Sequence, residues 1–264
     1  MNVFTRNIAR KAWLLTNTES YYPLCGIKCN NFHSTEPYSN TFAPKTEISA
    51  IRKDQCMQNV NWRKTGAIPE DRFMDKMKKL MRKFSLFENK KMTLHGFLLY
   101  STLEDVRIIE FMNLLELEDS FYSWFKITEL HVWMLLVRLM QEEADLRKLR
   151  SALINAMWED AHIRAKKIST GYSSLSSNFK QLNNEFKMVL FSYDEGLLGN
   201  DMILCNALWY YFFHSKCDDP QKLEALISYI RQQVDHLYLH QLSTPGKIPE
   251  NLWLPLEPHL KSSG

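Results

Sequence analysis

The strongest apolar run of the chain covers residues 124–140, WFKITELHVWMLLVRLM. Its apolar side chains are interrupted by ionisable ones at Lys126, Glu129, His131 and Arg138. A membrane-spanning helix needs roughly twenty apolar residues, so this run is too short and too charged to cross a bilayer. We predict that it forms the central buried helix of a helical fold.

Further helices are expected on both sides of this run. Apolar positions spaced three and four residues apart predict them over residues 94–103, 106–117, 146–167, 173–191 and 202–214. No proline lies between Asp71 and Asp219, which agrees with helices because proline breaks helix interiors. Gly196 and Gly199, in SYDEGLLGND, predict a loop.

A last helix is signalled at its start. Asp219 offers a capping carboxylate, and Pro220 has the fixed backbone angle that suits the first helical position. This helix is predicted to run to about Gln241. The proline-rich residues 244–264 are predicted to form an irregular tail.

The N-terminal residues 1–40 have the composition of a mitochondrial transit peptide. Arg6, Arg10 and Lys11 precede the first acidic residue, Glu19, and apolar residues recur at helical spacing among them. The alternative is an ordinary N-terminal helix of the fold. Residues 41–65 are polar with no sustained period, which predicts a flexible linker.

Residues 71–84 predict an amphipathic helix with one strongly basic face. Such a face can bind an anionic membrane or RNA, or it can be a solvated surface of the bundle. The residues expected to contact membrane or RNA are Arg72, Lys76, Lys79, Arg82 and Lys83.

The composition is that of an ordinary globular protein and does not indicate a partner. Hydrophobic residues make up 45% and charged residues 24% of the 264 positions, which is ordinary for a globular protein. The net charge of +3 does not indicate a particular partner. Five cysteines without a disulfide-type spacing predict free thiols in a reducing compartment.

Candidate chemistry is sparse. The sequence has no Gly-rich phosphate loop and no hydrolase or zinc-protease motif. His236 and His240 are spaced for one helix face but lack a third ligand, and Cys205, His214 and Cys217 fit no zinc template. We therefore predict no metal and no cofactor.

Two sets of ionisable residues in apolar sequence leave alternatives open. His131 is expected to be a hydrogen-bonded core histidine, with haem ligation or acid–base work as the alternative. Arg138, Asp160, Asp194 and Glu195 could form a catalytic cluster or buried ion pairs that fix helix register. We favour ion pairs because no nucleophile accompanies them.

Five segments in order, FYSWFKITELHVWMLLVRL, MWED, SYDEGLLGND, ALWYYFF and KCDDP, resemble the ubiquinol–cytochrome c chaperone family. The resemblance covers about residues 64–241. It implies an all-α fold without catalytic activity, located on the matrix side of the mitochondrial inner membrane as a peripheral protein. It also implies a small assembly-factor partner protein, action near the mitochondrial ribosome, and support of newly made cytochrome b, the first step in building complex III.

The sequence thus predicts a single all-α helical-bundle domain over residues 66–243, preceded by a presequence and a linker. The competing functions are a helical haem-binding carrier or enzyme, which would use His131, His236 or His240, and an RNA-binding translational regulator. If the chain is an assembly chaperone, the residues expected to bind its partners are Trp124, His131, Asp160, Asp194, Glu195 and Trp209.

Overall fold

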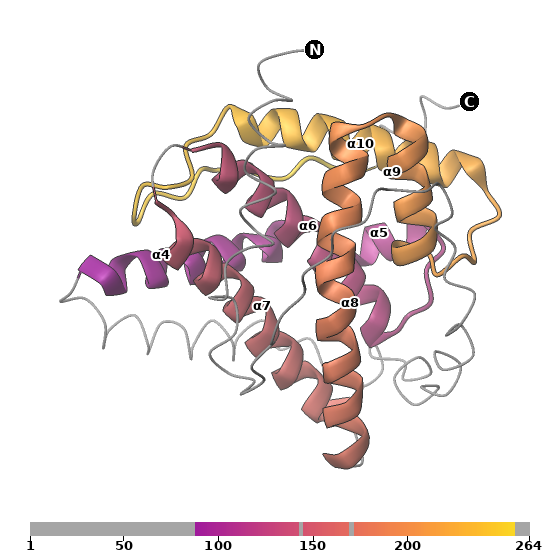
Figure 1. The fold of residues 1–264 in the computed structure, drawn as a ribbon, viewed down its shortest axis with the longest axis horizontal. Helices are drawn as coiled ribbons and strands as arrows, with labels where there is room; N and C mark the ends of the chain where they lie inside the picture. Colours follow the sequence, from indigo (N-terminus) through magenta and orange to yellow (C-terminus); the bar gives the residue numbers. More distant parts are fainter. Residues whose placement is uncertain (1–87, 143–144, 169–171, 257–264) are drawn as a thin grey trace, which may run out of the picture.

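The computed structural model describes residues 88–142, 145–168 and 172–256 (Figure 1). This part of the chain consists of helices and connecting segments and contains no strand, which confirms the predicted all-α class. In chain order its elements are α4 (Glu88–Ser101), the 3-10 helix η2 (Thr102–Asp105), α5 (Ile108–Leu114), α6 (Phe121–Gln141), α7 (Arg147–Ile168), α8 (Tyr172–Leu198), α9 (Asp201–Ala207), the π-helical turn η3 (Leu208–Phe212) and α10 (Pro220–Tyr238).

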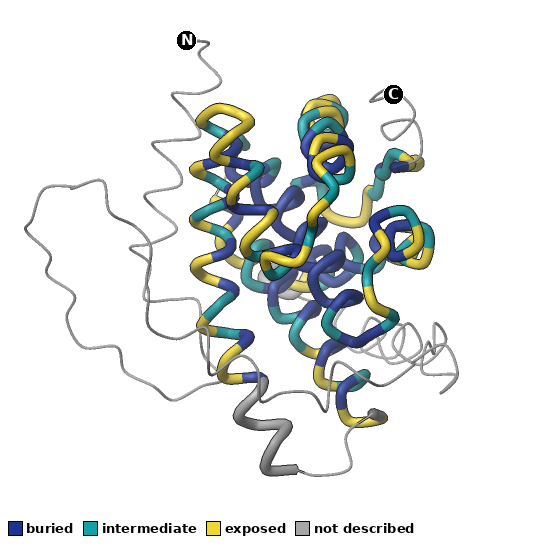
Figure 2. The backbone as a smooth tube through the Cα atoms, turned by 90° about the vertical axis from the view of Figure 1, so that its right-hand side faces the viewer, coloured by how far each residue is buried: buried dark blue, intermediate teal, exposed yellow. Residues whose placement is uncertain are grey.

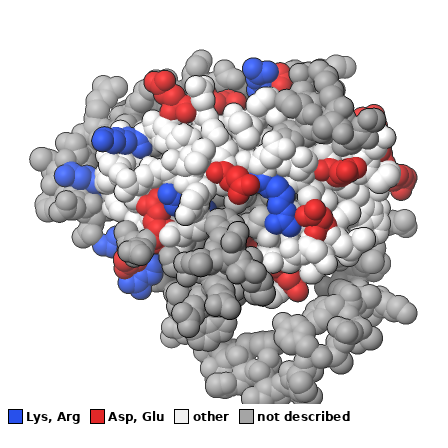
Figure 3. Space-filling view, turned by 90° about the horizontal axis from the view of Figure 1, so that it is seen from above, with Lys and Arg blue, Asp and Glu red and all other residues white. Residues whose placement is uncertain are grey.

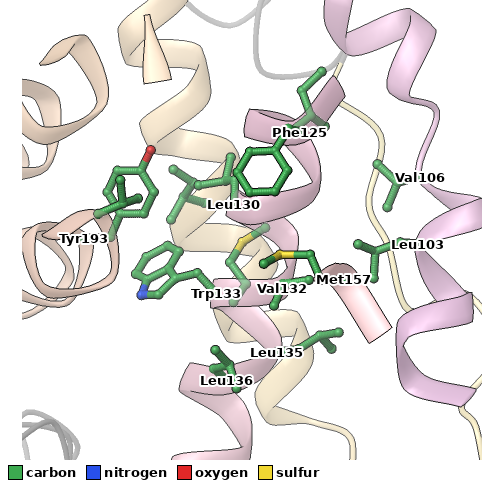
Figure 4. Packing of buried hydrophobic residues seen from close by; sticks show 14 of the residues in the cluster. Leu103, Val106, Phe125, Leu130, Val132, Trp133, Leu135, Leu136, Met157 and Tyr193 are labelled. Atoms are coloured by element: carbon green, nitrogen blue, oxygen red, sulfur yellow. The ribbon is translucent and has the colours of Figure 1, made fainter. Parts of the chain in front are cut away.

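Helix α6 is the centre of the fold, as predicted. Ser120 caps its start at Phe121, because the Ser120 hydroxyl accepts a hydrogen bond from the backbone N–H of Ser123 at 3.2 Å. Nearly all of its residues are buried, because α5, α7, α8 and α10 pack around it. Trp133 is 1% exposed and lies among leucines in the core (Figure 4). Buried positions lie where helices face one another, and exposed ones lie on their outer sides (Figure 2).

A glycine permits the close approach of α4 and α7. A Cβ atom on Gly96 would lie 2.6 Å from Cβ of Ala152 and 2.8 Å from the carbonyl oxygen of Leu149. Carbon atoms in contact are normally about 3.5–4.0 Å apart, so only a residue without a side chain fits here. The two helices can therefore pack backbone against backbone.

The prediction of a loop around Gly196 is wrong. Helix α8 continues through Leu198, and the connection to α9 is only Gly199 and Asn200. Gly196 is needed because α9 folds back on α8: a Cβ there would lie 2.6 Å from Cα of Leu204. The glycine thus serves a helix–helix contact, which sequence spacing alone does not distinguish from a loop.

The predicted helix over residues 202–214 corresponds to α9 and η3, and its geometry changes to π-helical at Leu208. Helix α9 is capped by Asn200, which accepts from the N–H of Ile203 at 3.1 Å, and it widens into the π-helical η3. The chain then turns through His214 and Ser215, whose φ angles of 52° and 58° are left-handed. Asp219 caps α10 as predicted, accepting from the N–H of Gln221 at 2.9 Å.

Residues 239–256, which we call the C-terminal strap, contain no helix and yet are packed into the fold. Nε2 of His95 donates to the carbonyl of Leu242 at 2.7 Å, and the indole N–H of Trp253 donates to the carbonyl of Thr102 at 2.9 Å. Leu252 and Leu256 are 2% exposed. The last helix ends at Tyr238, three residues before the predicted end at Gln241, and the apolar residues of the strap complete the core.

Several sequence predictions fall on residues that are not described. The presequence, the linker and the basic helix over residues 71–84 all lie before residue 88, outside the described residues. In the part of the chain that is described, no helix combines the length and apolarity that crossing a bilayer requires.

Candidate interaction surface

Trp124 and Asp160 belong to one buried network that joins three helices. Asp160, on α7, accepts hydrogen bonds from the hydroxyl of Tyr100 on α4 and from Nε of Arg164, each at 2.8 Å. The guanidinium of Arg164 lies 4.5 Å from the ring centroid of Trp124 on α6. Trp124 and Asp160 are 3% and 4% exposed, so these side chains orient helices and do not reach the surface.

His131 is a core histidine whose two ring nitrogens are both hydrogen-bonded. Its Nδ1 donates to the carbonyl of Ile127 at 2.7 Å, which leaves Nε2 to accept from the hydroxyl of Tyr229 at 2.9 Å. Burial lowers the pKa of His131 to about 4, and the bond to Ile127 opposes this only in part. The imidazole is therefore neutral, and both ring nitrogens are occupied.

A buried ion-pair network that the sequence did not predict lies on the N-terminal half of α6. Nζ of Lys126 donates to Glu129 at 2.9 Å and to Glu185 on α8 at 2.8 Å, and the hydroxyl of Tyr122 donates to Glu185 at 3.1 Å. The spacing of Lys126 and Glu129 within an apolar run was a usable signal. Glu185 lies too far along the chain for any local pattern to pair it with them.

In this network the charge of Lys126 is well compensated by its neighbours, whereas the charge of Glu129 is not. Burial opposes the charge on Lys126, but the carboxylates of Glu129 and Glu185 outweigh it and raise its pKa. Burial raises the pKa of Glu129 to about 7, and Lys126 opposes this shift. Among the described residues, Oε1 of Glu129 has no hydrogen-bond partner, so this carboxylate has too little compensation for its burial.

The neighbours Asp194 and Glu195 on α8 point in different directions. Asp194 accepts a 2.8 Å hydrogen bond from the indole N–H of Trp133, and burial raises its pKa to about 6 although that bond opposes the shift. Glu195 is exposed. Arg138 donates to the carbonyls of Leu237 and His240 and pairs with Glu142. Arg138, Asp160 and Asp194 thus have separate partners.

An exposed apolar surface lies on α8, α9 and η3. Gly196 faces Leu204, which places α8 directly against α9. Glu195 lies one turn beyond Phe191 on α8. We call this the α8–α9 surface; its members, from 37% to 67% exposed, are Met188, Phe191, Met202, Ile203, Trp209 and Tyr210.

These side chains suit recognition of apolar partners. Aromatic residues and methionine are enriched where proteins bind one another, and the flexible thioether of methionine adapts to varied shapes. Trp209 is held in place, because its indole N–H donates to the carbonyl of Cys217 at 3.1 Å. Of the six residues that the sequence proposed for partner binding, Glu195 and Trp209 are exposed.

The weak metal candidates do not assemble into a site. The rings of His236 and His240 are 5.0 Å apart, but Nε2 of His236 donates to the carbonyl of Asn251 at 3.0 Å. Cys205 and Cys217 are free thiols. Within the described ranges, no group of three or more His, Cys, Asp or Glu residues is arranged to hold a metal ion.

Comparison with known proteins assigns the chain to a family. A sequence model described as ubiquinol-cytochrome C chaperone matches residues 113–243. The chain is 36% identical, over 95% of its length and 93% of the relative's, to ubiquinol-cytochrome c reductase complex assembly factor 1 of Drosophila melanogaster. The chain belongs to the ubiquinol–cytochrome c chaperone family. No solved structure matches it.

Other members of the family match a shorter region. The human protein named ubiquinol-cytochrome c reductase complex assembly factor 1 is 39% identical over 52% of this chain and 46% of its own length. The yeast Protein CBP3, mitochondrial, is 30% identical over 46% of this chain and 37% of its own. The family match spans α6 to α10, and therefore includes the Lys126 ion-pair network and the whole α8–α9 surface.

Proposed function

We propose that this chain is an assembly factor of the mitochondrial ubiquinol–cytochrome c reductase, complex III, and that it acts as a chaperone without catalysing a reaction. The observation that carries this proposal is the similarity, over almost the whole chain, to a Drosophila protein named as an assembly factor of that complex. The neutral, doubly hydrogen-bonded His131 supports a scaffolding role for the central helix. No observation favours a haem-binding alternative.

Its place of action in this proposal is the matrix side of the mitochondrial inner membrane. The yeast relative is named as mitochondrial, and the basic, acid-poor residues 1–40 suit an import signal. The basic face of residues 71–84 would attach the protein peripherally to anionic lipid. The proposed partners are newly made cytochrome b, a small assembly-factor protein and the mitochondrial ribosome.

Within this function, the α8–α9 surface is proposed to hold an apolar segment of newly made cytochrome b. Cytochrome b is very hydrophobic and must be held before its haems and its partner subunits arrive. Six half-exposed methionine, isoleucine and aromatic side chains on two adjacent helices offer such a segment an adaptable apolar contact. Glu195, Trp209 and Met202 are the residues expected to contribute most directly.

Loss of the protein tests the function. Depletion should lower cytochrome b and assembled complex III, measured on native gels, more than it lowers the other respiratory complexes. Re-expression of the wild type should restore both. An equal loss of all complexes would indicate a general role in mitochondrial gene expression, and normal complex III would refute the proposal.

Site-specific cross-linking tests the surface. A photoreactive phenylalanine analogue placed at Met202 or at Tyr210 should cross-link to newly made cytochrome b in isolated mitochondria. The same analogue at Leu239, which is 77% exposed at the end of α10, is the matched control and should not. Equal cross-linking from all three positions, or from Leu239 alone, would show that the docking surface is misplaced.

A further inference from the structure

The methionines of the described residues divide into exposed and buried ones. Met202 is 67% exposed and Met188 is 52% exposed, and both belong to the α8–α9 surface. Met92 is partly buried and packs against the core. The others are at most 8% exposed: Met112, Met134, Met140 and Met157. In the part of the chain that the structure describes, the exposed methionines therefore all lie on the α8–α9 surface.

Both exposed thioethers share a helix face with an aromatic side chain of that surface. Met188 precedes Phe191 by three residues on α8, which places the two on one face of that helix. Met202 precedes Trp209 by about two helical turns along α9 and η3. Met202 lies in the first turn of α9, which the side chain of Asn200 caps. The two methionines are thus part of the apolar contact area itself.

Exposure decides which methionines a small oxidant reaches. A peroxide must approach the sulfur lone pair directly, so a thioether in a close-packed core is shielded from it. Oxidation turns the flexible, apolar side chain into a polar, chiral sulfoxide. A sulfoxide loses its hydrogen bonds to water when an apolar partner covers it, which is unfavourable because the partner offers no donor in exchange.

We propose that Met188 and Met202 are the peroxide-sensitive sites of the helical domain, and that their oxidation to methionine sulfoxide weakens apolar docking at the α8–α9 surface. The oxidant is hydrogen peroxide. The sulfur lone pair attacks one peroxide oxygen and forms the S–O bond, while the O–O bond breaks. The transferred oxygen gives up its proton to the departing hydroxide, which leaves as water. Sulfur loses two electrons and the peroxide gains two.

Oxidation would place one polar group on each of the two helices that form the surface. An apolar segment that lies across α8 and α9 would cover the sulfoxide of Met188 on the first and that of Met202 on the second. This consequence for docking rests on the proposed function. The choice of the two oxidation sites does not, because it follows from their exposure alone.

Peptide mapping identifies the oxidised positions. The purified full chain is treated with hydrogen peroxide, catalase removes the excess, and mass spectrometry follows the gain of one oxygen atom at each methionine over time. Met188 and Met202 should oxidise roughly tenfold faster than Met112, Met134 and Met157, because packing shields the core sulfurs. Equal rates in a chain whose circular dichroism shows it still folded, or faster oxidation of the core methionines, would overturn the assignment.

Docking is measured with a matched variant. Met188→Leu/Met202→Leu keeps two apolar side chains of similar volume and has no thioether at either position. Both proteins carry the photoreactive phenylalanine analogue at Tyr210, are oxidised in the same way, and are present during cell-free synthesis of cytochrome b. Oxidation should lower the cross-linking yield of the protein with both methionines several-fold and leave that of the leucine variant nearly unchanged.

The leucine variant separates this effect from oxidation elsewhere, because the cysteines and the remaining methionines are the same in both proteins. An equal loss of cross-linking in both would assign the effect to other residues and overturn the proposal. An undiminished yield from the fully oxidised protein would overturn it as well. If neither protein cross-links before peroxide treatment, the proposed function of this surface fails and its oxidation has no docking to weaken, while the mapping still decides the oxidation sites.

Discussion

Replacing Lys126 with methionine tests whether the buried ion-pair network holds α6 against α8. Methionine keeps the length of the side chain and removes the ammonium that donates to Glu129 at 2.9 Å and to Glu185 at 2.8 Å. Removing one partner of a buried ion pair costs about 3–5 kcal/mol, because the other charge stays buried without compensation. A domain typically has about 5–15 kcal/mol of stability, so the loss should be large.

The pH dependence of this loss has a definite sign. Burial already raises the pKa of Glu129 from its ordinary value to about 7, and Lys126 is the group that opposes the rise. In Lys126→Met that pKa should rise further, so the folded state prefers the protonated carboxyl. A raised folded-state pKa gives stability that is present at low pH and lost as the pH rises. The deficit of Lys126→Met should therefore be nearly constant below pH 6 and grow as the pH rises through 7 to 8.

Urea unfolding followed by circular dichroism measures the effect. Arg107→Met is the matched control, because it breaks an ion pair of the same spacing with Glu110 at the surface, where such pairs contribute about 0–1 kcal/mol. The double variant Lys126→Met/Glu129→Leu removes both buried charges and should recover part of the loss. If Lys126→Met and Arg107→Met lose equally little stability, the reasoning from the buried network is refuted.

Three further predictions concern stability. Asp194→Asn keeps an acceptor for Trp133 and removes a carboxyl whose pKa burial raises to about 6, so wild-type stability falls as the pH rises from 4 to 7. The melting temperature of the variant should therefore rise relative to that of the wild type over this range. A constant difference in melting temperature would contradict the raised pKa of Asp194. Gly96→Ala should cost about 1–3 kcal/mol by overpacking α4 against α7, and adding Ala152→Gly should restore part of it; a neutral Gly96→Ala would mean that the helices are further apart. Trp253→Phe, which loses the bond to Thr102 but keeps a ring, should lower the free energy of unfolding by about 1 kcal/mol in urea titrations, whereas no change would show that this bond does not hold the C-terminal strap.

Local signals account for most of what the sequence predicted correctly. The apolar run of α6 has helical length and few charges, and the Asp219–Pro220 start of α10 depends only on backbone geometry at that point. Gly196 was misread because its role is to admit Leu204 from another helix. A glycine in a helix contact and a glycine in a loop look the same in one sequence.

Contacts between residues far apart in the sequence limit how much of the candidate site could be predicted from the sequence. Lys126 and Glu129 were visible as charges in an apolar run, but Glu185, which completes their network, is on another helix. The packing of the C-terminal strap depends on single hydrogen bonds from distant residues such as His95, which no local pattern reveals. The exposure of Trp209 depends on how α9 lies on α8, which local spacing does not encode.

Pulse labelling of mitochondrial translation products tests the central proposal most directly. Newly made cytochrome b should co-purify with the tagged protein within minutes of its synthesis, and in cells that lack the protein it should be made more slowly or degraded faster than the other labelled products. Normal synthesis and lifetime of cytochrome b without this protein, and no labelled cytochrome b bound to it, would contradict the account.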